Sequence, residues 1–385
     1  MPPPLSRVVV PLGIAQTLAW GSTYYLPAIL ANGMALDTGS STAYVFGAFS
    51  GALLTGGVLS PISGRIIDVH GGRRVLAVSN LIFASALATL AYAASPGLLL
   101  LGWLMMGVGM SCGLYEAAFT TLAGIYGTEA RKPITGITLI AGFASTVCWP
   151  ISAWLDADFG WRNTCLVWAA VHLVIALPLN LLVPQAAGAH LSTKQQGPPA
   201  EIPHKRAIMA ALAFIFAATW FSSTAMAAHL PRVLQEAGAS LPAAVFAAAL
   251  IGPAQVAARL LEFSFMRHHH PVVAARVAAL THPIGVVGLV TIGAPAAPFF
   301  TVFHGLGNGV MTIANGTLPL SYFGPGGYGL RQGLLMAPAR LLQASAPFIF
   351  DLLLSRYGLG SLAMTAALGM CSFTVMMFLP RTVHK

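Results

Sequence analysis

Charged side chains are scarce in this chain of 385 residues. Asp, Glu, Lys and Arg make up 8% of the sequence, whereas a typical soluble domain contains about 25% of them. Hydrophobic residues make up 57%. So few charges cannot cover the surface of a soluble protein of this size. The composition therefore excludes a soluble globular protein and predicts an integral membrane protein.

Cysteine is also scarce. Cys112, Cys148, Cys165 and Cys371 all lie within apolar runs, and no metal-ligand spacing joins them. We therefore expect neither a disulfide framework nor a zinc site. The apolar runs also carry no set of nucleophile, base and metal ligands at mid-membrane depth. The sequence thus predicts a protein that is not an enzyme and needs no cofactor.

Long apolar runs fill most of the chain. A membrane-spanning helix needs about 20 predominantly apolar residues, and twelve runs approach that length. We predict spans at Val8–Ala31, Ala43–Ile67, Val75–Ala93, Leu98–Leu122, Thr135–Leu155, Thr164–Val183, Ala207–Leu230, Pro242–Phe265, Val272–Gly293, Phe299–Leu320, Gly333–Leu354 and Gly360–Leu379. The first run is too long for the apolar core of a secretory signal and shows no cleavage site, so we expect it to be retained.

The spans fall into two sets of six. Residues 184–206 form the longest polar stretch, rich in Pro, Gly and Gln, and this composition predicts a linker. We therefore expect a bundle at 1–183 and another at 207–385. Matching residues recur between them at an offset of roughly 195 residues. The matches are Arg65 and Asp68 with Arg259 and Glu262, Gly136 and Pro150 with Gly333 and Pro347, and Gly107 and Gly109 with Gly305 and Gly307.

The net charge of +9 follows the predicted topology. With the amino terminus inside the cell, most Lys and Arg residues fall on the cytoplasmic side. The other side holds Arg162, Arg232 and Arg356, and Arg340 lies within a span. This asymmetry is the positive-inside rule, so both termini are expected in the cytoplasm. The basic excess is a topology signal, and we expect no nucleic-acid partner.

A short charged hairpin, Ser60–Leu76, separates the second and third spans. Gly64 permits close packing of helices, and Gly71 and Gly72 supply the turn. Asp68 is placed to cap the following helix or to pair with a neighbouring Arg. The pattern Gly64, Arg65, Asp68, Gly72, Arg73, Arg74 resembles the loop between helices two and three of the major facilitator superfamily of secondary transporters. The "GWR" at Gly160–Arg162, which opens the sixth span, is another recurring feature of that family.

The resemblance covers the whole chain and implies an all-α integral membrane protein. It implies twelve transmembrane helices in two six-helix pseudo-symmetric halves, which rock about a midplane site. The implied protein is a monomer in the lipid bilayer of a bacterial inner membrane, moving a small solute by alternating access. A proton is the candidate co-transported ion, as in symport. The charged hairpin acts as a cytoplasmic latch in that family, so we expect gating roles for Arg65, Asp68, Arg73, Arg74, Arg259 and Glu262.

Ionisable groups inside spans are costly there and are therefore candidates for function. Glu116, in the fourth span, shares a helical face with Met105, Gly109 and Cys112. It is either a proton-carrying or gating carboxylate or a residue near the cytoplasmic boundary that pairs with a loop Arg. The sequence leaves both interpretations open.

The tenth span has the clearest polar stripe, which comprises His304, Asn308, Met311 and Asn315 at helical spacing. Helix ten lines the central cavity in the resembled family, so we expect His304, Asn308 and Asn315 to bind substrate. The alternative is that Asn hydrogen-bonds between helices.

The first span also lines that cavity in the family. It presents Gln16, Trp20 and Tyr24 on one face, and aromatic rings with polar tips suit an organic solute. Core packing or an interfacial belt is the alternative role for Trp20 and Tyr24.

The eleventh span carries Arg340 with Gln343 one turn away. A planar guanidinium suits a carboxylate, so these two residues predict a small organic anion as substrate. By the internal repeat, Trp149 lies at the equivalent depth in the fifth span. For Asp351, nearer the outer end, a purely structural role would be to pair with Arg356.

Two features suggest metal, and both have simpler explanations. Adjacent histidines, as in His268, His269 and His270, do not converge easily on one ion, so we interpret them as a half-basic loop. Met105, Met106 and Met110 raise the alternative of soft-metal (copper) uptake, but Met is also ordinary membrane packing. We expect no metal site.

The remaining alternatives concern the kind of transporter. Drug–proton exporters of the family usually have an Arg four residues before a Gly in helix four, where this chain has Trp103 before Gly107. A basic residue in helix eleven with a polar helix ten loosely resembles the monocarboxylate and oxalate/formate branches. We therefore favour an organic anion, with export of drug-like neutral or cationic compounds as the alternative and a non-transporting receptor below it.

Overall fold

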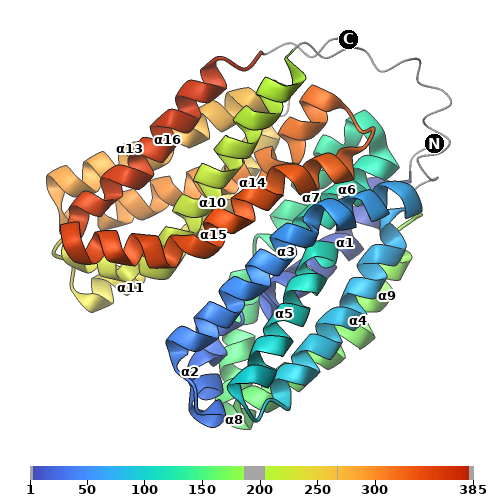
Figure 1. Cartoon of the computed structure of the whole chain (residues 1–385). Helices are drawn as coiled ribbons and strands as arrows, with labels where there is room; N and C mark the ends of the chain where they lie inside the picture. Colours follow the sequence, from blue (N-terminus) through green and yellow to red (C-terminus); the bar gives the residue numbers. More distant parts are fainter. Residues whose placement is uncertain (1–2, 186–203, 267, 381–385) are drawn as a thin grey trace. The chain divides into compact units, whose positions relative to one another are not determined.

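The computed structural model describes residues 3–185, 204–266 and 268–380, and almost all of them are helical (Figure 1). The amino-terminal helices are α1 Leu5–Ser22, α2 Pro27–Thr38, α3 Thr42–His70, α4 Gly72–Ala91, α5 Pro96–Gly113, α6 Tyr115–Tyr126, α7 Arg131–Ala141, α8 Ala144–Val171 and α9 Leu177–Leu182. The carboxy-terminal helices are α10 Lys205–Glu236, α11 Leu241–Ala249, α12 Ile251–Leu261, α13 Pro271–Ile292, α14 Ala297–Phe323, α15 Tyr328–Tyr357 and α16 Leu362–Met377. No strand occurs within the described residues, and the all-α fold class is confirmed.

Several helices begin where a serine caps the first turn. The hydroxyl of Ser41 accepts a hydrogen bond from the backbone N–H of Tyr44 at the start of α3. Ser95 and Ser240 cap α5 and α11 in the same way, and each is followed by a proline within the first two helical positions. Proline there removes an N–H that has no helical partner and fixes a helical φ angle. These local signals define helix starts inside an otherwise apolar sequence.

Four predicted spans are broken in the structure. The fifth divides between α7 and α8 and the eighth between α11 and α12. The first span, Val8–Ala31, divides between α1 and α2, because Thr23 leaves the helical region and Pro27 starts a new helix. The fourth span, Leu98–Leu122, divides at Leu114, whose backbone is extended. The breaks in the first and fourth spans lie within runs that are apolar on average, although Thr23 and Glu116 lie at or beside them, so hydropathy alone does not reveal them.

Other spans run on where the sequence predicted a gap. The fifth and sixth spans are joined through α8, with a kink at Gly160, whose φ is +78°. A π-helical turn, His172–Ala176, then leads into α9. The eighth span likewise stays helical to its predicted end, because a second π-helical turn, Glu262–Met266, follows α12 directly.

Seven helical stretches within the described residues are long and apolar enough to cross a membrane. They are Thr42–His70, Gly72–Ala91, Pro96–Leu182, Lys205–Glu236, Leu241–Met266, Pro271–Ile292 and Tyr328–Met377. Two of them contain more than one predicted span, since Pro96–Leu182 covers three and Tyr328–Met377 covers two. The multi-pass character is clear, and the number of twelve spans stays a prediction.

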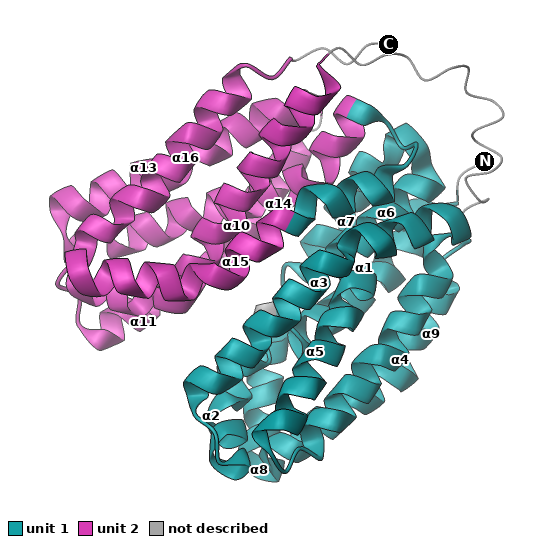
Figure 2. Ribbon diagram, in the orientation of Figure 1, with its two compact units in different colours: residues 1–201, 323–337 teal, residues 202–322, 338–385 magenta. Residues whose placement is uncertain are grey.

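The chain divides into two compact units (Figure 2). Unit 1 comprises residues 1–201 and 323–337, and unit 2 comprises residues 202–322 and 338–385. From the sequence, we placed 323–337 with the second bundle, whereas in the structure this segment belongs to unit 1. The helix α15 therefore passes from unit 1 to unit 2 between Ala337 and Pro338. The predicted boundaries at 183 and 207 stay a prediction, and most of the linker lies outside the described residues.

Each unit has its own apolar core. In unit 1, α5 packs between α3 and α4, and the large side chains of Phe83, Trp103 and Phe119 are fully buried. In unit 2, Phe300 of α14 and Phe350 of α15 are buried in one cluster with residues of α10, α13 and α16. These cores fix the helices on which the candidate site residues lie.

Candidate functional site

In unit 1, the carboxylate of Asp68 binds the amino-terminal end of α15. Its two oxygens accept hydrogen bonds from the backbone N–H groups of Gly329 and Leu330, each at 2.9 Å. The positive end of the helix macrodipole and two otherwise unpaired N–H groups make this a favourable place for an acid. From the sequence, Asp68 was expected to cap the following helix α4 or to pair with a neighbouring Arg, and the structure corrects this because Asp68 caps α15 instead. The guanidinium of Arg331 also stabilises the carboxylate electrostatically.

Glycine brings α3 and the start of α15 close enough for that contact. A Cβ atom at Gly64 would overlap the backbone of Gly329, and a Cβ atom at Gly333 would overlap the backbone of Ser60. The two helices therefore touch through backbone rather than side chains, as small residues permit in membranes. Any side chain at Gly64 would push α15 away from Asp68.

The other predicted gating residues of unit 1 lie on α3, α4 and α6. Arg65 is exposed on α3, and Arg73 and Arg74 lie in the first turn of α4 rather than in the turn before it. Glu116 is buried in the first turn of α6, within electrostatic reach of the Tyr328 hydroxyl. Because the helix breaks at Leu114, Glu116 does not continue the α5 face that carries Met105 and Gly109, and that part of the prediction is wrong.

The equivalent residues of unit 2 are placed differently. Arg259 lies in the last turn of α12, and Glu262 opens the π-helical turn that follows. Both side chains are buried. A Gly-Gly turn does not follow them, so the repeat preserves the charges and changes the backbone around them.

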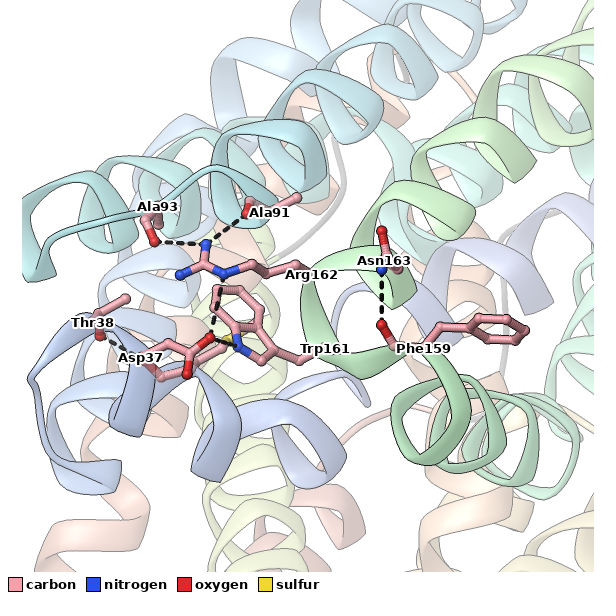
Figure 3. Close-up of polar contacts among 9 residues, drawn as sticks. Asp37, Thr38, Ala91, Ala93, Phe159, Trp161, Arg162 and Asn163 are labelled. Atoms are coloured by element: carbon pink, nitrogen blue, oxygen red, sulfur yellow. Dashed lines mark hydrogen bonds and ion pairs between the residues drawn. The ribbon is translucent and has the colours of Figure 1, made fainter.

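A second polar cluster of unit 1 is built on the "GWR" segment (Figure 3). Nη1 of Arg162 donates to the carbonyl oxygens of Ala91 at 2.7 Å and Ala93 at 2.8 Å, at the end of α4. Its Nε lies 3.3 Å from Oδ2 of Asp37, which also accepts from Nε1 of Trp161 at 2.9 Å. One guanidinium thus joins α2, α4 and α8. It caps carbonyls that the helix itself leaves unpaired.

Aromatic rings of unit 1 gather at the break between α1 and α2. The Trp20 ring lies 5.3 Å from Tyr24 and 4.9 Å from Tyr115, measured between ring centroids. Trp149 of α8 packs edge-on against Tyr25 at 5.6 Å and donates from Nε1 to the Tyr25 carbonyl. The predicted residues Trp20, Tyr24 and Trp149 therefore belong to one aromatic cluster.

Two polar atoms next to this cluster are buried without a hydrogen-bond partner in the described residues. They are Nε1 of Trp20 and Oε1 of Gln16. The Gln16 side chain is held by its other end, since Nε2 donates to the Gly113 carbonyl at 2.7 Å. One donor and one acceptor thus lie one helical turn apart on α1, and buried groups of this kind suit polar atoms of a solute.

Arg340 of α15 is buried in unit 2. Its Nη1 donates to Oε1 of Gln343 at 2.7 Å, and its guanidinium carbon lies 5.0 Å from the centroid of Trp220 on α10. The hydrogen bond and the ring together fix the plane of the guanidinium. The sequence correctly paired Arg340 with Gln343, and the role of Trp220 was missed.

Near the carboxy-terminal end of α15, the ion pair of Asp351 differs from the one considered from the sequence. Asp351 pairs with Arg232 of α10 at 2.7 Å, so the alternative in which it pairs with Arg356 is wrong. Arg356 instead lies over the ring of Tyr357. Helix packing across unit 2 determines this pair, and sequence spacing on α15 does not show it.

A cavity of about 50 Å³ lies within unit 2. Its lining comes from α10, α13, α14 and α16, and it includes His282, His304, Asn308, Met311 and Thr365. Three residues of the predicted polar stripe therefore line it. Asn315, the fourth, is buried but is not among the lining residues.

The histidines of the loop before α13 are not arranged around an ion. Nδ1 of His270 accepts a hydrogen bond from the backbone N–H of Val272 and so caps α13. Its ring lies 5.0 Å from that of Tyr322. Nowhere in the described part of the chain do three or more His, Cys, Asp or Glu side chains gather in a way that could hold a metal ion.

Comparison with known proteins decides the family. The family model described as Major Facilitator Superfamily matches residues 12–337. The chain belongs to this superfamily. It resembles the human organic anion transporter TETRAN, with a TM-score of 0.76 and 16% identity over 97% of this chain and 100% of that one. The proton:xylose symporter XylE gives a TM-score of 0.73 at 15% identity, covering 98% of this chain and 97% of the symporter. At 15–16% identity, these two structures show that the fold is shared and nothing about the substrate.

Curated relatives match over about half of their length. The 4-hydroxybenzoate transporter PcaK of Pseudomonas putida is 26% identical over 225 residues, which cover 49% of this chain and 50% of the relative. A homologue of the multidrug efflux pump PmrA from Lactococcus lactis is 25% identical over 182 residues, covering 44% of this chain and 43% of the relative. One relative is named as a transporter of an organic acid and the other as a drug efflux pump, so these matches do not decide between the two substrate classes.

Some residues of this superfamily member were missed from the sequence. Asp37 was overlooked because it is a lone acid at the end of an apolar run, and its partner Arg162 lies 125 residues away. His282 and Thr365 were overlooked because each is an isolated polar residue in a predicted span. A polar residue inside an apolar run was the available signal for both.

Proposed function

We propose that the protein is a secondary transporter that moves a small organic anion across the membrane by alternating access. Membership of the superfamily supports transport, and Arg340 supports the anion. Under this proposal, substrate-binding roles fall to Trp20, Tyr24, Trp149, His304, Asn308, Asn315, Arg340 and Gln343, and gating roles fall to Arg65, Asp68, Arg73, Arg74, Glu116, Arg259 and Glu262.

The buried guanidinium of Arg340 is the observation that carries the substrate class. Placing Arg at the centre of a membrane helix costs at least about 2.5–3.5 kcal/mol. A residue with that cost is usually functional. Gln343 offers it a neutral acceptor at 2.7 Å, and Trp220 holds its plane. A guanidinium fixed in this way presents a planar fork of donors, which matches a carboxylate better than the point charge of Lys.

The curated relatives agree with this choice in part. The transporter from P. putida is named for 4-hydroxybenzoate, an aromatic carboxylate. Considered by itself, the aromatic cluster of unit 1 suits the flat, apolar body of an organic solute. We therefore choose 4-hydroxybenzoate as the first probe for binding.

Binding to purified protein tests the proposal. A thermal-shift screen would compare 4-hydroxybenzoate and other small carboxylates with amino acids and with cationic dyes. Carboxylates should stabilise the wild type, Arg340→Lys should weaken that effect, and Arg340→Gln should nearly remove it. Arg232→Gln, which changes an exposed Arg of the same unit, should behave like the wild type. Stabilisation by cationic or neutral ligands alone, or by carboxylates in Arg340→Gln, refutes the anion class.

Export of drug-like compounds is the second candidate function. The aromatic cluster of unit 1 and the efflux-pump relative favour it. Against it, Trp103 stands where drug–proton exporters usually carry an Arg, and its ring is fully buried against Phe49 in the core. The same screen separates the two, because cationic dyes would stabilise a drug exporter and carboxylates would not.

A further inference from the structure

The cavity of unit 2 contains a chain of hydrogen bonds that fixes the protonation of two histidines. Nδ1 of His304 lies 3.0 Å from Nδ1 of His282, and Nε2 of His282 lies 2.9 Å from Oγ1 of Thr365. The Thr365 hydroxyl is within 3.1 Å of the Leu362 carbonyl, which can only accept. His282 is 9% exposed and His304 is 5% exposed, so the geometry of this chain is set by packing.

The directions of these bonds follow from the carbonyl at the end of the chain. Thr365 donates its only proton to Leu362, so it must accept from His282, which then carries its proton on Nε2. Nδ1 of neutral His282 is therefore an acceptor, and Nδ1 of His304 donates to it. His304 then carries its proton on Nδ1, and its Nε2 is a bare lone pair.

That lone pair belongs to a ring that lines the cavity. Nε2 of His304 has no hydrogen-bond partner in the part of the chain that the structure describes. It is also not among the polar atoms fully shielded from solvent there. The neighbouring amide of Asn308, one turn along α14, likewise faces the cavity without a side-chain hydrogen bond. An acceptor and an amide thus share one small polar space.

The size of the cavity indicates what it holds. A water molecule needs about 10–15 Å³ of such volume, so about 50 Å³ accommodates about three to five waters. The lining polar groups include Thr219, Ser222 and Ser223 of α10, which are hydrogen-bonding residues without charge. A hydrated cavity of this size suits a proton delivered through water better than a large organic solute.

Charges near the cavity are few. None of the described residues that line it is Asp, Glu, Lys or Arg, and His282 is the other titratable group on the lining. On the lining helices, the charged residue nearest in sequence to a lining residue is Arg276 of α13, two residues before Ala278. Its guanidinium donates to the carbonyls of Met376 and Leu379 at the end of α16. Since like charges on the two adjacent rings repel, the histidine pair accepts one proton and not two.

We propose that Nε2 of His304 is the proton-accepting atom of unit 2, with His282 and Thr365 as positioning residues that keep it unprotonated at rest. In the loading step, a hydronium ion in the cavity transfers a proton to Nε2, an N–H bond forms, and a neutral water molecule remains. The positive charge rests on His304 while the cavity is hydrated. The atom assignment is independent of the substrate, whereas its use in transport rests on the proposed function.

Nitrogen-15 NMR of purified protein labelled at histidine tests the atom assignment without any substrate. At about pH 8, the signals lost in His304→Gln should show a protonated Nδ1 and a bare Nε2. On acidification, that Nε2 should be the first nitrogen of the His282–His304 pair to gain a proton. His229 is the internal reference, because its Nε2 binds the Pro347 carbonyl and must carry a proton. A protonated Nε2 of His304 at about pH 8, or a bare one throughout, overturns the proposal.

Thr365→Val supplies a second variant that keeps both histidines. It removes the acceptor that orients His282, so His304 should show a mixture of both tautomers at about pH 8. Thr291→Val, on the exposed face of α13, is the matched control and should leave the spectrum unchanged. An unchanged His304 signal in Thr365→Val overturns the positioning role.

Transport supplies a readout that a merely structural role would not give. Proteoliposomes would be loaded to measure both proton-driven accumulation and exchange of 4-hydroxybenzoate. His304→Gln should lose accumulation and lower exchange by a smaller factor, because His304 is also assigned to substrate binding, whereas His229→Gln should retain both. Accumulation by His304→Gln overturns the proposal. If the wild type neither binds nor moves any anion, the proposed function fails, and the NMR result alone decides the assignment of His304.

Discussion

At the scale of single residues, Arg162 stabilises the fold through its hydrogen bonds as well as through its ion pair with Asp37. Its pairing with Asp37 is about half exposed, and exposed pairs contribute about 0–1 kcal/mol. The two hydrogen bonds to the carbonyls of Ala91 and Ala93 supply the larger part of the stabilisation by Arg162, since they satisfy acceptors at a helix end. A Lys ammonium cannot reach both carbonyls and the carboxylate in this geometry.

We predict that Arg162→Lys lowers the free energy of unfolding by about 1 kcal/mol. Thermal unfolding of the purified protein measures it. Arg232→Lys is the matched control, because Arg232 also pairs with an exposed acid but, among the described residues, donates only to the side chains of Asp351 and Ser355. The two variants should differ, and equal loss in both would show that the carbonyl contacts of Arg162 contribute nothing.

Single residues also show the limit of sequence reasoning. Arg340 with Gln343, and the stripe His304, Asn308 and Met311, were predictable because partners one or two turns apart on one helix can be counted. The partners of Asp68 are 261 and 262 residues away, so spacing cannot reveal them. Which polar groups meet across helices depends on packing, and packing could not be predicted from the spacing of residues in the sequence.

At the scale of elements, the attachment of α15 to α3 depends on Asp68. Asn in its place has one carbonyl oxygen and an N–H₂ group, so it cannot accept from both backbone N–H groups as the carboxylate does. It also loses the attraction to the helix N-terminus, worth about 0.3–1 kcal/mol at exposed sites. The contact should be weakened but not removed, because the glycine packing around Gly64 remains.

We predict that Asp68→Asn slows uptake of 4-hydroxybenzoate into proteoliposomes without reducing the amount of protein inserted. Glu262→Gln should have a smaller effect, since the Gly-Gly turn is absent from its segment. Asp158→Asn, at an exposed position of α8, serves as control and should transport normally. If Asp68→Asn transports like the wild type, this contact has no part in gating.

Elements also differ in how far the sequence predicts them. The hairpin at Gly71 was predicted because glycine is needed there, and its φ of +80° confirms the reason. The breaks at Thr23 and Leu114 were not predicted, because the polar residues beside them, such as Ser22 and Glu116, lie within runs that are apolar on average. Helix interruption in a membrane protein is set by packing and cavities, which hydropathy does not record.

At the scale of the whole molecule, the orientation in the membrane remains a proposal. By the positive-inside rule, the distribution of Lys and Arg predicts that both termini and the linker lie in the cytoplasm. We predict that Ser192→Cys, in a background without other cysteines, reacts with a membrane-impermeant reagent only after cells are opened. Ser192 lies outside the described residues, so this test depends on topology alone. Labelling in intact cells would reverse the orientation.

Transport of an organic anion that depends on Arg340 is the central claim. Exchange of radiolabelled 4-hydroxybenzoate across proteoliposomes containing the wild type, Arg340→Lys, Arg340→Gln or Arg232→Gln tests it most directly. The account predicts exchange by the wild type and Arg232→Gln, weaker exchange by Arg340→Lys, and almost none by Arg340→Gln, with all four proteins equally inserted. Undiminished exchange by Arg340→Gln would contradict it.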